Sequence, residues 1–389
     1  MIMRRVAVIG VGMSKFGEHW EKSFRDLVLE AGKNALVDAA LHGDEIDAIY
    51  AGSMSPGSMV GQEHVAALIA DYIGINPKPA TRVEGACASG GLAFRAAYMA
   101  VASGMHDIVV AGGAEKMTDL EPNVVTTVLG GAGDEEWELF QGATFPAIYA
   151  LMARCHMEKY GTTEEDLAKV AVKNHKHASL NPFAQFQNEI TVEEVLDSKI
   201  VASPLKLLDC SPISDGAAVA ILAPLDVAKK YSDTVVEVLS SAQASGPIAL
   251  HDRASLTSIE ATRVAAKKAF EAAKTTPEKI DVVEVHDCFT IAEILALEDI
   301  GFYRKGDAVK AIRDGEHYIG GKLPVNTSGG LKGCGHPVGA TGIKQIVELT
   351  NQLRGTVGKR QVNGAEYALA HNVGGSGATA VVSILKRHK

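Results

Sequence analysis

The side chain best suited to nucleophilic chemistry is Cys87, which lies in the segment EGACASGG of residues 84–91. This glycine-flanked turn opens an expected helix over residues 92–99. A thiol at a helix N-terminus faces the positive end of the helix dipole and free N–H groups, and both favour the thiolate. The alternative is a buried cysteine that packs as a small apolar side chain, which is the commoner fate of a single free cysteine.

Three further segments carry a histidine where an expected strand ends or an expected helix begins. They are HDCF at residues 286–289, GCGHP at 333–337 and HNVGGSG at 371–377. Each alone is also compatible with a hydrogen-bonded structural histidine or a tight glycine turn. In an open α/β sheet, however, reactive groups gather beyond the carboxyl ends of the strands. If the fold brings these loops to the Cys87 turn, the four together form one composite site.

The elements that would position these loops occur twice along the chain. The first copy has an expected strand over residues 5–10, an amphipathic helix over 23–40 and a strand over 45–52. The same order returns as a strand over 235–239, a helix over 258–273 and a strand over 279–286. The Cys87 turn then corresponds to residues 335–342, and each copy closes with two strands, at 107–111 and 217–222 and at 367–370 and 378–384. The sequence therefore predicts an α/β fold built from two duplicated βαβαβαββ halves.

A long insertion separates the two closing strands of the first copy. It carries aromatic and methionine side chains, followed by a charged helix over residues 163–178. A segment of this length is too long for a structureless loop, so we expect a helical cap over the first half. Such insertions often bind substrate, although a purely architectural cap is the alternative. The predicted domains are an N-terminal half (1–118 and 201–233), a substrate-cap insertion (119–200) and a C-terminal half (234–389).

Length and composition exclude several classes of function. A chain of 389 residues is too long for one ordinary core, and its net charge of −9 argues against nucleic acid as the main partner. The five cysteines are scattered and lack CxxC spacing, so neither a disulfide framework nor a metal site is expected. The N-terminal segment lacks the pattern of a signal peptide, and no window reaches the run of about 18 apolar residues that a membrane span needs. A cytoplasmic location is the simplest expectation.

The chain resembles the thiolase superfamily over essentially its whole length. The segments CASGG at residues 87–91, GHPVGATG at 335–342 and GGSG at 374–377 are similar to that family's signatures in order and position. Residues 160–168, with His175 and Ala178, are similar to its loop domain. The resemblance implies a five-layered αβαβα fold that assembles as a homodimer or a tetramer.

The resemblance also implies roles for individual residues. Cys87 would take the acyl group of acyl-CoA as a thioester, and His336 would accept the proton of its thiol. His286 stands where most thiolases have asparagine, and it would contribute to the oxyanion hole for the second acyl-CoA. The backbone N–H groups of Cys87 and Val373 would form the other oxyanion hole.

One position departs from the usual family pattern. Where ordinary thiolases have a second catalytic cysteine, this sequence has His371. In archaeal thiolases and those of the sterol-carrier-protein type, the HDCF motif supplies the replacement sulfur, so Cys288 is the favoured acid/base. His371 is the second candidate and Cys334 the third, whereas Cys155 and Cys210 match no catalytic loop and are interpreted as structural.

The implied activity is that of an acetyl-CoA C-acetyltransferase, which condenses two acetyl-CoA molecules to acetoacetyl-CoA and CoA without a cofactor. Archaeal members feed the mevalonate pathway of isoprenoid biosynthesis. They associate with 3-hydroxy-3-methylglutaryl-CoA synthase and a small zinc-ribbon/OB-fold bridging protein, so a multienzyme complex is expected.

Two other functions stay open. Cys87, His286 and His336 also form the Cys-His-His set of a decarboxylating ketoacyl synthase. Such an enzyme removes no α-proton, so it would not require Cys288. The second alternative is a weakly active acyl-CoA-binding scaffold subunit, against which the intact nucleophile argues, since binding alone needs none.

Overall fold

The main structural feature is one long sheet. The computed structural model describes residues 3–388 and contains a nine-stranded sheet of order β3-β2-β4-β7-β1-β8-β11-β10-β9, together with a separate β5-β6 pair. The strands are β1 (Val6–Met13), β2 (Ala48–Gly52), β3 (Ala80–Val83), β4 (Val109–Glu115), β5 (Ile200–Ala202), β6 (Leu205–Lys206), β7 (Gly216–Pro224), β8 (Val235–Ser245), β9 (Val282–Glu284), β10 (Tyr367–Gly374) and β11 (Thr379–His388).

The sheet order confirms the predicted duplication. The first half runs β3-β2-β4-β7-β1 and the second, read from the opposite edge, runs β9-β10-β11-β8, so the equivalent strands β1 and β8 pair antiparallel in the middle. The third strand of the second half is reduced to a single bridge between Val283 and Val325. It stops there because Asn326, Gly329 and Gly330 adopt positive φ, which ends the extended backbone.

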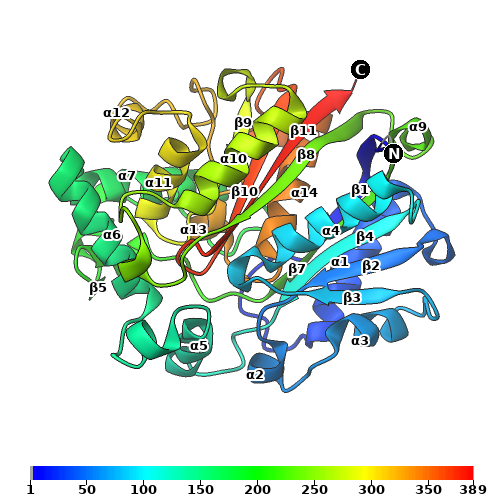
Figure 1. Cartoon of the computed structure of the whole chain (residues 1–389), viewed down its shortest axis with the longest axis horizontal. Coiled ribbons are helices and arrows are strands. Elements are labelled where there is room, and N and C mark those ends of the chain that lie inside the picture. The colour runs from blue at the N-terminus through cyan, green and yellow to red at the C-terminus, as the bar shows by residue number, and fades with distance from the viewer. Residues whose placement is uncertain (1–2, 389) are drawn as a thin grey trace.

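The two halves of the sheet count as two layers, and the helices outside and between them bring the fold to five layers (Figure 1). On the outside, α1 covers the strands of the first half and α10 those of the second, while α4 and α14 contact each other and strands of both halves. The helices are α1 (Phe24–Ala39), α2 (Pro56–Val60), α3 (Val65–Tyr72), α4 (Ser89–Ser103), α5 (Pro122–Gly130), α6 (Phe145–Tyr160), α7 (Glu164–Ala178), α8 (Val192–Asp197), α9 (Leu225–Ala228), α10 (Glu260–Ala273), α11 (Thr290–Ile300), α12 (Ala308–Arg313), α13 (Gly330–Cys334) and α14 (Thr341–Arg354).

Glycines allow the N-termini of α4 and α14 to meet in the middle layer. A Cβ on Gly90 would lie 2.7 Å from the carbonyl oxygen of Gly339, and a Cβ on Gly342 would collide with the backbone of Gly91. Only glycine permits this approach of two backbones. Because Cys87 lies just before α4 and His336 just before α14, the same approach brings these two side chains together.

The insertion packs differently from our expectation. Its two long helices, α6 and α7, lie against α11 and the neighbouring helices of the second half, not over the first half (Figure 1). Buried polar pairs explain this placement: Lys173 Nζ lies 2.6 Å from a carboxylate oxygen of Glu293, and Asn174 donates to Asp287 at 2.7 Å. These partners are far apart in the sequence, so the pairing could not be foreseen.

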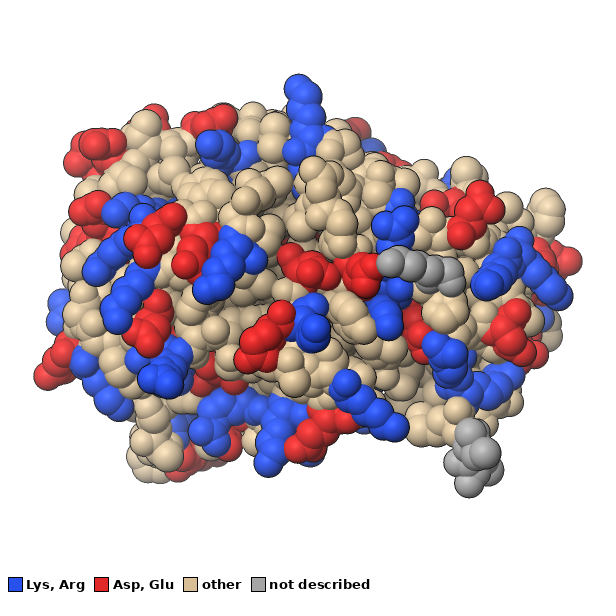
Figure 2. Space-filling model, turned by 90° about the horizontal axis from the view of Figure 1, so that it is seen from above, with Lys and Arg blue, Asp and Glu red and all other residues tan. Residues whose placement is uncertain are grey.

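The surface carries both signs of charge without a large field of one sign on the face shown in Figure 2. The net charge of −9 is therefore not gathered into an acidic patch on that face. None of the helices in the described residues 3–388 has the length and apolar character that a membrane crossing requires.

Candidate active site

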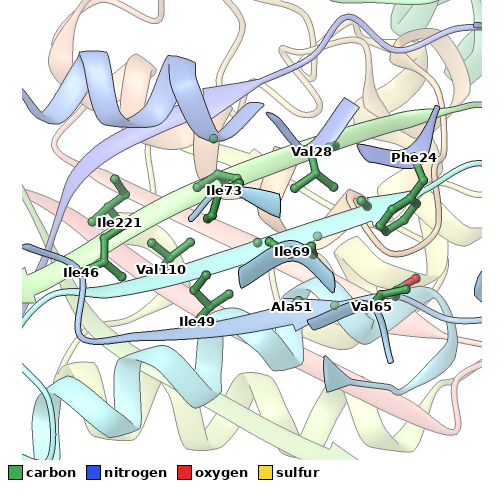
Figure 3. A pocket seen from close by; sticks show the side chains of 18 of the residues that line it. Phe24, Val28, Ile46, Ile49, Ala51, Val65, Ile69, Ile73, Val110 and Ile221 are labelled. Atoms are coloured by element: carbon green, nitrogen blue, oxygen red, sulfur yellow. The ribbon is translucent and has the colours of Figure 1, made fainter. Parts of the chain in front are cut away.

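Two cavities inside the fold differ sharply in chemistry. The first, of about 60 Å³, lies between α1, α3 and the first half of the sheet, where Val28, Ile69 and Val110 face one another (Figure 3). None of the described residues that line it is a cysteine, a histidine or a charged residue. The second, of about 150 Å³, is lined by Cys87, Cys288 and His336 among other side chains, so we take it as the candidate active site.

Cys87 lies in a single 3-10 turn, Ala86–Ala88, directly before α4, and it is half-buried. Burial raises the pKa of its thiol to about 12, although the N–H of Gly375 donates to the sulfur and lowers it in part; the charge of Glu115 raises it further. The expectation that the helix N-terminus makes Cys87 a thiolate is therefore wrong for the resting site. Loss of hydration outweighs the helix dipole, so the thiol needs a base to react.

His336 has the position and the tautomer that such a base requires. Its Nδ1 lies 2.7 Å from the hydroxyl of Thr341, and that hydroxyl donates to the carbonyl oxygen of Pro337 at 3.0 Å. The hydroxyl must then accept from Nδ1–H, which leaves the lone pair of His336 on Nε2. Burial lowers the pKa of His336 to about 3, and the charge of Lys344 lowers it further, so the ring is neutral near pH 7.

His286 has the opposite tautomer. Its Nδ1 lies 3.2 Å from Nδ2 of Asn372, whose amide orientation is set because Gly91 N–H donates to its Oδ1 at 3.0 Å. Nδ1 therefore accepts, and the proton of the neutral ring is on Nε2, which is buried and has no partner. Burial, with the nearby His336, holds the pKa of His286 well below its usual value. The ring thus offers one unused N–H donor.

The three groups converge on one point. The Cys87 sulfur and one ring nitrogen of each of His286 and His336 all lie within 4.8 Å of one another. A metal would need a lone pair from both rings and an acceptor behind each histidine. The amide donor of Asn372 behind His286 prevents this, so the cluster fits a nucleophile, a base and an oxyanion donor better than a metal site.

Cys288 reaches the same cavity from the loop after β9. It is 7% exposed, and burial raises the pKa of its thiol well above the usual range, as does the proximity of Cys87. The preceding Asp287 accepts from the backbone N–H groups of Leu331 and Lys332 at 2.7 and 3.2 Å. These bonds fix the loop and leave Cys288 facing the cavity.

The other predicted site residues lie at its margin. The Nε2 of His371 bonds to Thr262 Oγ1 of α10 at 2.9 Å, and its ring is not among the residues that line the cavity. Val373 is paired with Ala380 in the β10–β11 ladder, and the backbone N–H groups that act on the Cys87 sulfur are those of Gly375 and of Cys87 itself.

The remaining cysteines are distributed over core, surface and cavity. Cys334 is completely buried in the core, 3.6 Å from Asn181 Nδ2, and Cys155 is half-buried on α6. Cys210, which we interpreted as structural, lines the cavity, where its thiol donates to the carbonyl of Lys206 at 3.3 Å.

Sequence reasoning missed two residues of the site. Asn372 donates to the carbonyl oxygen of Cys87 at 3.0 Å as well as to His286, and so ties the nucleophile to the oxyanion donor. Its position inside the HNVGGSG segment was the available indication. Tyr149 comes from α6 of the insertion and lines the cavity, and no motif pointed to it.

The chain is similar to two families of protein domain and to several named proteins. The thiolase N-terminal domain family matches residues 6–226, and the thiolase C-terminal domain-like family matches residues 242–387. The acetyl-CoA acetyltransferase of Methanothermobacter thermautotrophicus is 59% identical, over 99% of this chain and all of that protein. The enzyme of the same name from Methanocaldococcus jannaschii is 49% identical, over 98% of this chain and 99% of that protein. Human sterol carrier protein 2 is 37% identical, over 97% of this chain and 71% of its own length.

Solved structures show the same fold. The Ltp2-ChsH2(DUF35) aldolase superposes with a TM-score of 0.85 at 28% identity, over 99% of this chain and 98% of that one. Human mitochondrial 3-ketoacyl-CoA thiolase superposes over the full length of both chains with a TM-score of 0.76 at 15% identity, a likeness of fold. With both halves matched and full-length relatives at such identity, the chain belongs to the thiolase family and is an acyltransferase.

Proposed function

We propose that this protein is an acetyl-CoA C-acetyltransferase that condenses two acetyl-CoA molecules through an acetyl thioester on Cys87. The observation that carries the proposal is the convergence of the Cys87 sulfur, the His336 ring and the His286 ring within 4.8 Å. The two archaeal relatives that bear this enzyme name, at 59% and 49% identity, support the choice of substrate.

In the first half-reaction, His336 Nε2 takes the proton of Cys87 as the sulfur attacks the thioester carbonyl. Because the pKa of Cys87 is about 12 and that of His336 about 3, a separated ion pair is costly, so proton transfer accompanies attack. The oxyanion binds backbone N–H groups, among which we place those of Cys87 and Val373. Collapse breaks the C–S bond to CoA, and the departing CoA thiolate takes the proton from His336.

In the second half-reaction, ionised Cys288 removes an α-proton from the second acetyl-CoA. His286 Nε2–H, which has no other partner, donates to the thioester oxygen as negative charge develops there. The enolate carbon attacks the acetyl group on Cys87 and releases that sulfur, which takes up a proton from the solvent in place of the one that Cys288 gave to the solvent when it ionised. Cys288 ends as a thiol, the form that its burial favours. His371, hydrogen-bonded to Thr262, is the second candidate for this proton transfer.

The wider role is also a proposal. We place the enzyme in the cytoplasm, as a homodimer or tetramer, at the start of the mevalonate pathway of isoprenoid biosynthesis. There it would work in a complex with 3-hydroxy-3-methylglutaryl-CoA synthase and a small zinc-ribbon/OB-fold protein. This placement follows from the resemblance to archaeal thiolases, and the structural neighbour whose name includes DUF35 supports a partner protein. We propose no cofactor, since the CoA thioesters themselves supply the reacting groups.

The deciding experiment is product analysis with purified protein. Acetyl-CoA alone should yield acetoacetyl-CoA and CoA, and acetoacetyl-CoA with CoA should yield acetyl-CoA. Mass spectrometry should find one acetyl group on Cys87, absent in Cys87→Ala and retained in Cys155→Ala, whose thiol lies outside the cavity. Turnover of malonyl-CoA with release of CO2, and none of acetyl-CoA alone, would instead favour the decarboxylating synthase. Binding of acetyl-CoA without any product would favour the scaffold subunit.

A further inference from the structure

Tyr149 lies close to both reactive sulfurs. It lies on α6 of the insertion, is 1% exposed, and lines the cavity together with Cys87 and Cys288. Its ring packs against Phe289, the neighbour of Cys288, at a centroid distance of 4.7 Å. Its hydroxyl donates to the carbonyl oxygen of Gly375 at 3.1 Å. A side chain from the cap thus touches two catalytic loops at once.

The turn that contains Gly375 does not depend on Tyr149 for its position. Arg253 also holds this turn, with bonds of 2.8 Å to the carbonyl oxygen and 2.6 Å to the hydroxyl of Ser376. Loss of the Tyr149 hydroxyl therefore leaves two charge-assisted bonds that keep the turn in place. Because the turn keeps its position without the Tyr149 hydroxyl, a specific role of that hydroxyl can be tested.

The hydroxyl shares this cavity with the Cys288 sulfur; burial raises the pKa of that thiol most, and the neighbouring Tyr149 hydroxyl lowers it in part. When Cys288 carries its proton, S–H can donate to the Tyr149 oxygen while the phenolic O–H remains on Gly375. When Cys288 is ionised, its sulfur can only accept, and a rotation about the C–O bond of Tyr149 supplies a donor. Burial raises the pKa of Tyr149 well above its usual value, so the phenol keeps its proton throughout.

We propose that Tyr149 is a positioning residue for α-proton transfer, whose hydroxyl turns from the Gly375 carbonyl to the Cys288 sulfur when that sulfur ionises. The covalent O–H bond of Tyr149 stays intact in this movement, and only its hydrogen-bond acceptor changes. The hydroxyl returns to Gly375 once Cys288 has taken the α-proton from acetyl-CoA. The inference rests on the proposed function, because it assigns the proton transfer to Cys288.

The test is Tyr149→Phe, which keeps the ring against Phe289 and removes only the hydroxyl. We expect the rate of Cys87 acetylation and the KM for acetyl-CoA to stay within about threefold of wild type. Hydrogen–deuterium exchange at the acetyl-CoA methyl group should fall ~10–100-fold, the usual effect of losing one hydrogen bond to a charged group. The pH midpoint of exchange should move upward, because the pKa of Cys288 is no longer lowered by the phenol.

Tyr303→Phe is the matched control. It removes a partly buried hydroxyl that bonds to Glu316 and His317, and Tyr303 is not among the cavity-lining residues, so both rates should match wild type. Equal losses of acetylation and exchange in Tyr149→Phe, with an unchanged pH midpoint, would reduce Tyr149 to a structural role and overturn the inference. Wild-type exchange in this variant would overturn it too.

Two further measurements keep the outcome clear. If Tyr149→Phe does not fold, site-specific 3-fluorotyrosine at position 149 replaces it. This more acidic phenol should shift the exchange midpoint to lower pH, and an unchanged midpoint would refute the proposal. If the wild-type protein makes no acetoacetyl-CoA, the proposed function fails; if it does but Tyr149→Phe behaves like wild type, only the inference fails.

Discussion

Replacing His336 with alanine gives the most direct test of how Cys87 becomes a nucleophile. With a pKa of about 12, only about one Cys87 thiol in 10⁵ is ionised at pH 7, roughly 1,000-fold less than a thiol with a pKa of 9. A base within the site must therefore compensate for this low fraction of thiolate. Removal of a general base costs typically ~100–10,000-fold, and we expect acetylation of Cys87 at pH 7 to fall by that factor in His336→Ala.

The pH dependence of Cys87 acetylation distinguishes the two proteins more clearly. In the wild type the rate should stay flat from about pH 5 to 9, because His336, with a pKa of about 3, is already neutral and Cys87 is still a thiol. In His336→Ala the remaining rate should rise about tenfold per pH unit over this range, since it follows the thiolate. Quenched-flow mass spectrometry of the acetyl-enzyme measures both profiles, and the exposed His251→Ala serves as a control.

Either of two results would contradict this assignment of His336 as a neutral base. The first is a wild-type profile that falls below pH 6.5, which would show an imidazole with its ordinary pKa. The second is a flat profile in His336→Ala, which would show that another group activates Cys87. Thermal unfolding of the variant must accompany the kinetics, because His336 also anchors Thr341.

Three other predictions concern the α-proton transfer, a buried ion pair and the assembly of the enzyme. Cys288→Ala should still be acetylated at Cys87 but lose methyl exchange and condensation, as measured by NMR; exchange that survives in this variant and vanishes in His371→Ala would give the proton transfer to the histidine. Lys173→Ala leaves the carboxylate of Glu293 without its buried cation and should lower the free energy of unfolding by about 3–5 kcal/mol in urea titrations, whereas an effect below about 1 kcal/mol would show that water replaces the lysine. Gentle purification from the native source should recover the chain with another acyl-CoA enzyme, and recovery only as a free dimer or tetramer would count against a complex.

The sequence by itself determined the architecture and the reacting residue types. Strand and helix periods repeat in the two halves, and glycines mark the turns before α4 and α14, so the duplication and the meeting of Cys87 with His336 could be predicted. These signals are local: each depends on a few neighbouring residues and on backbone geometry that glycine alone allows. The length of the insertion predicted that it is helical, but its predicted position over the first half was wrong.

Tertiary structure decided the electrostatics and the direction of each side chain. The helix position of Cys87 indicated a low pKa, yet desolvation by distant segments raises it to about 12. Successive strand residues point to opposite faces, so only the register of β10 turns Asn372 toward the nucleophile and His371 toward α10. The tautomer of His286 and the contact of Tyr149 with two loops depend on partners 86 and 226 residues away. Hydration and hydrogen bonding are set by whatever the fold packs around a group, and no local pattern in the chain specifies those neighbours.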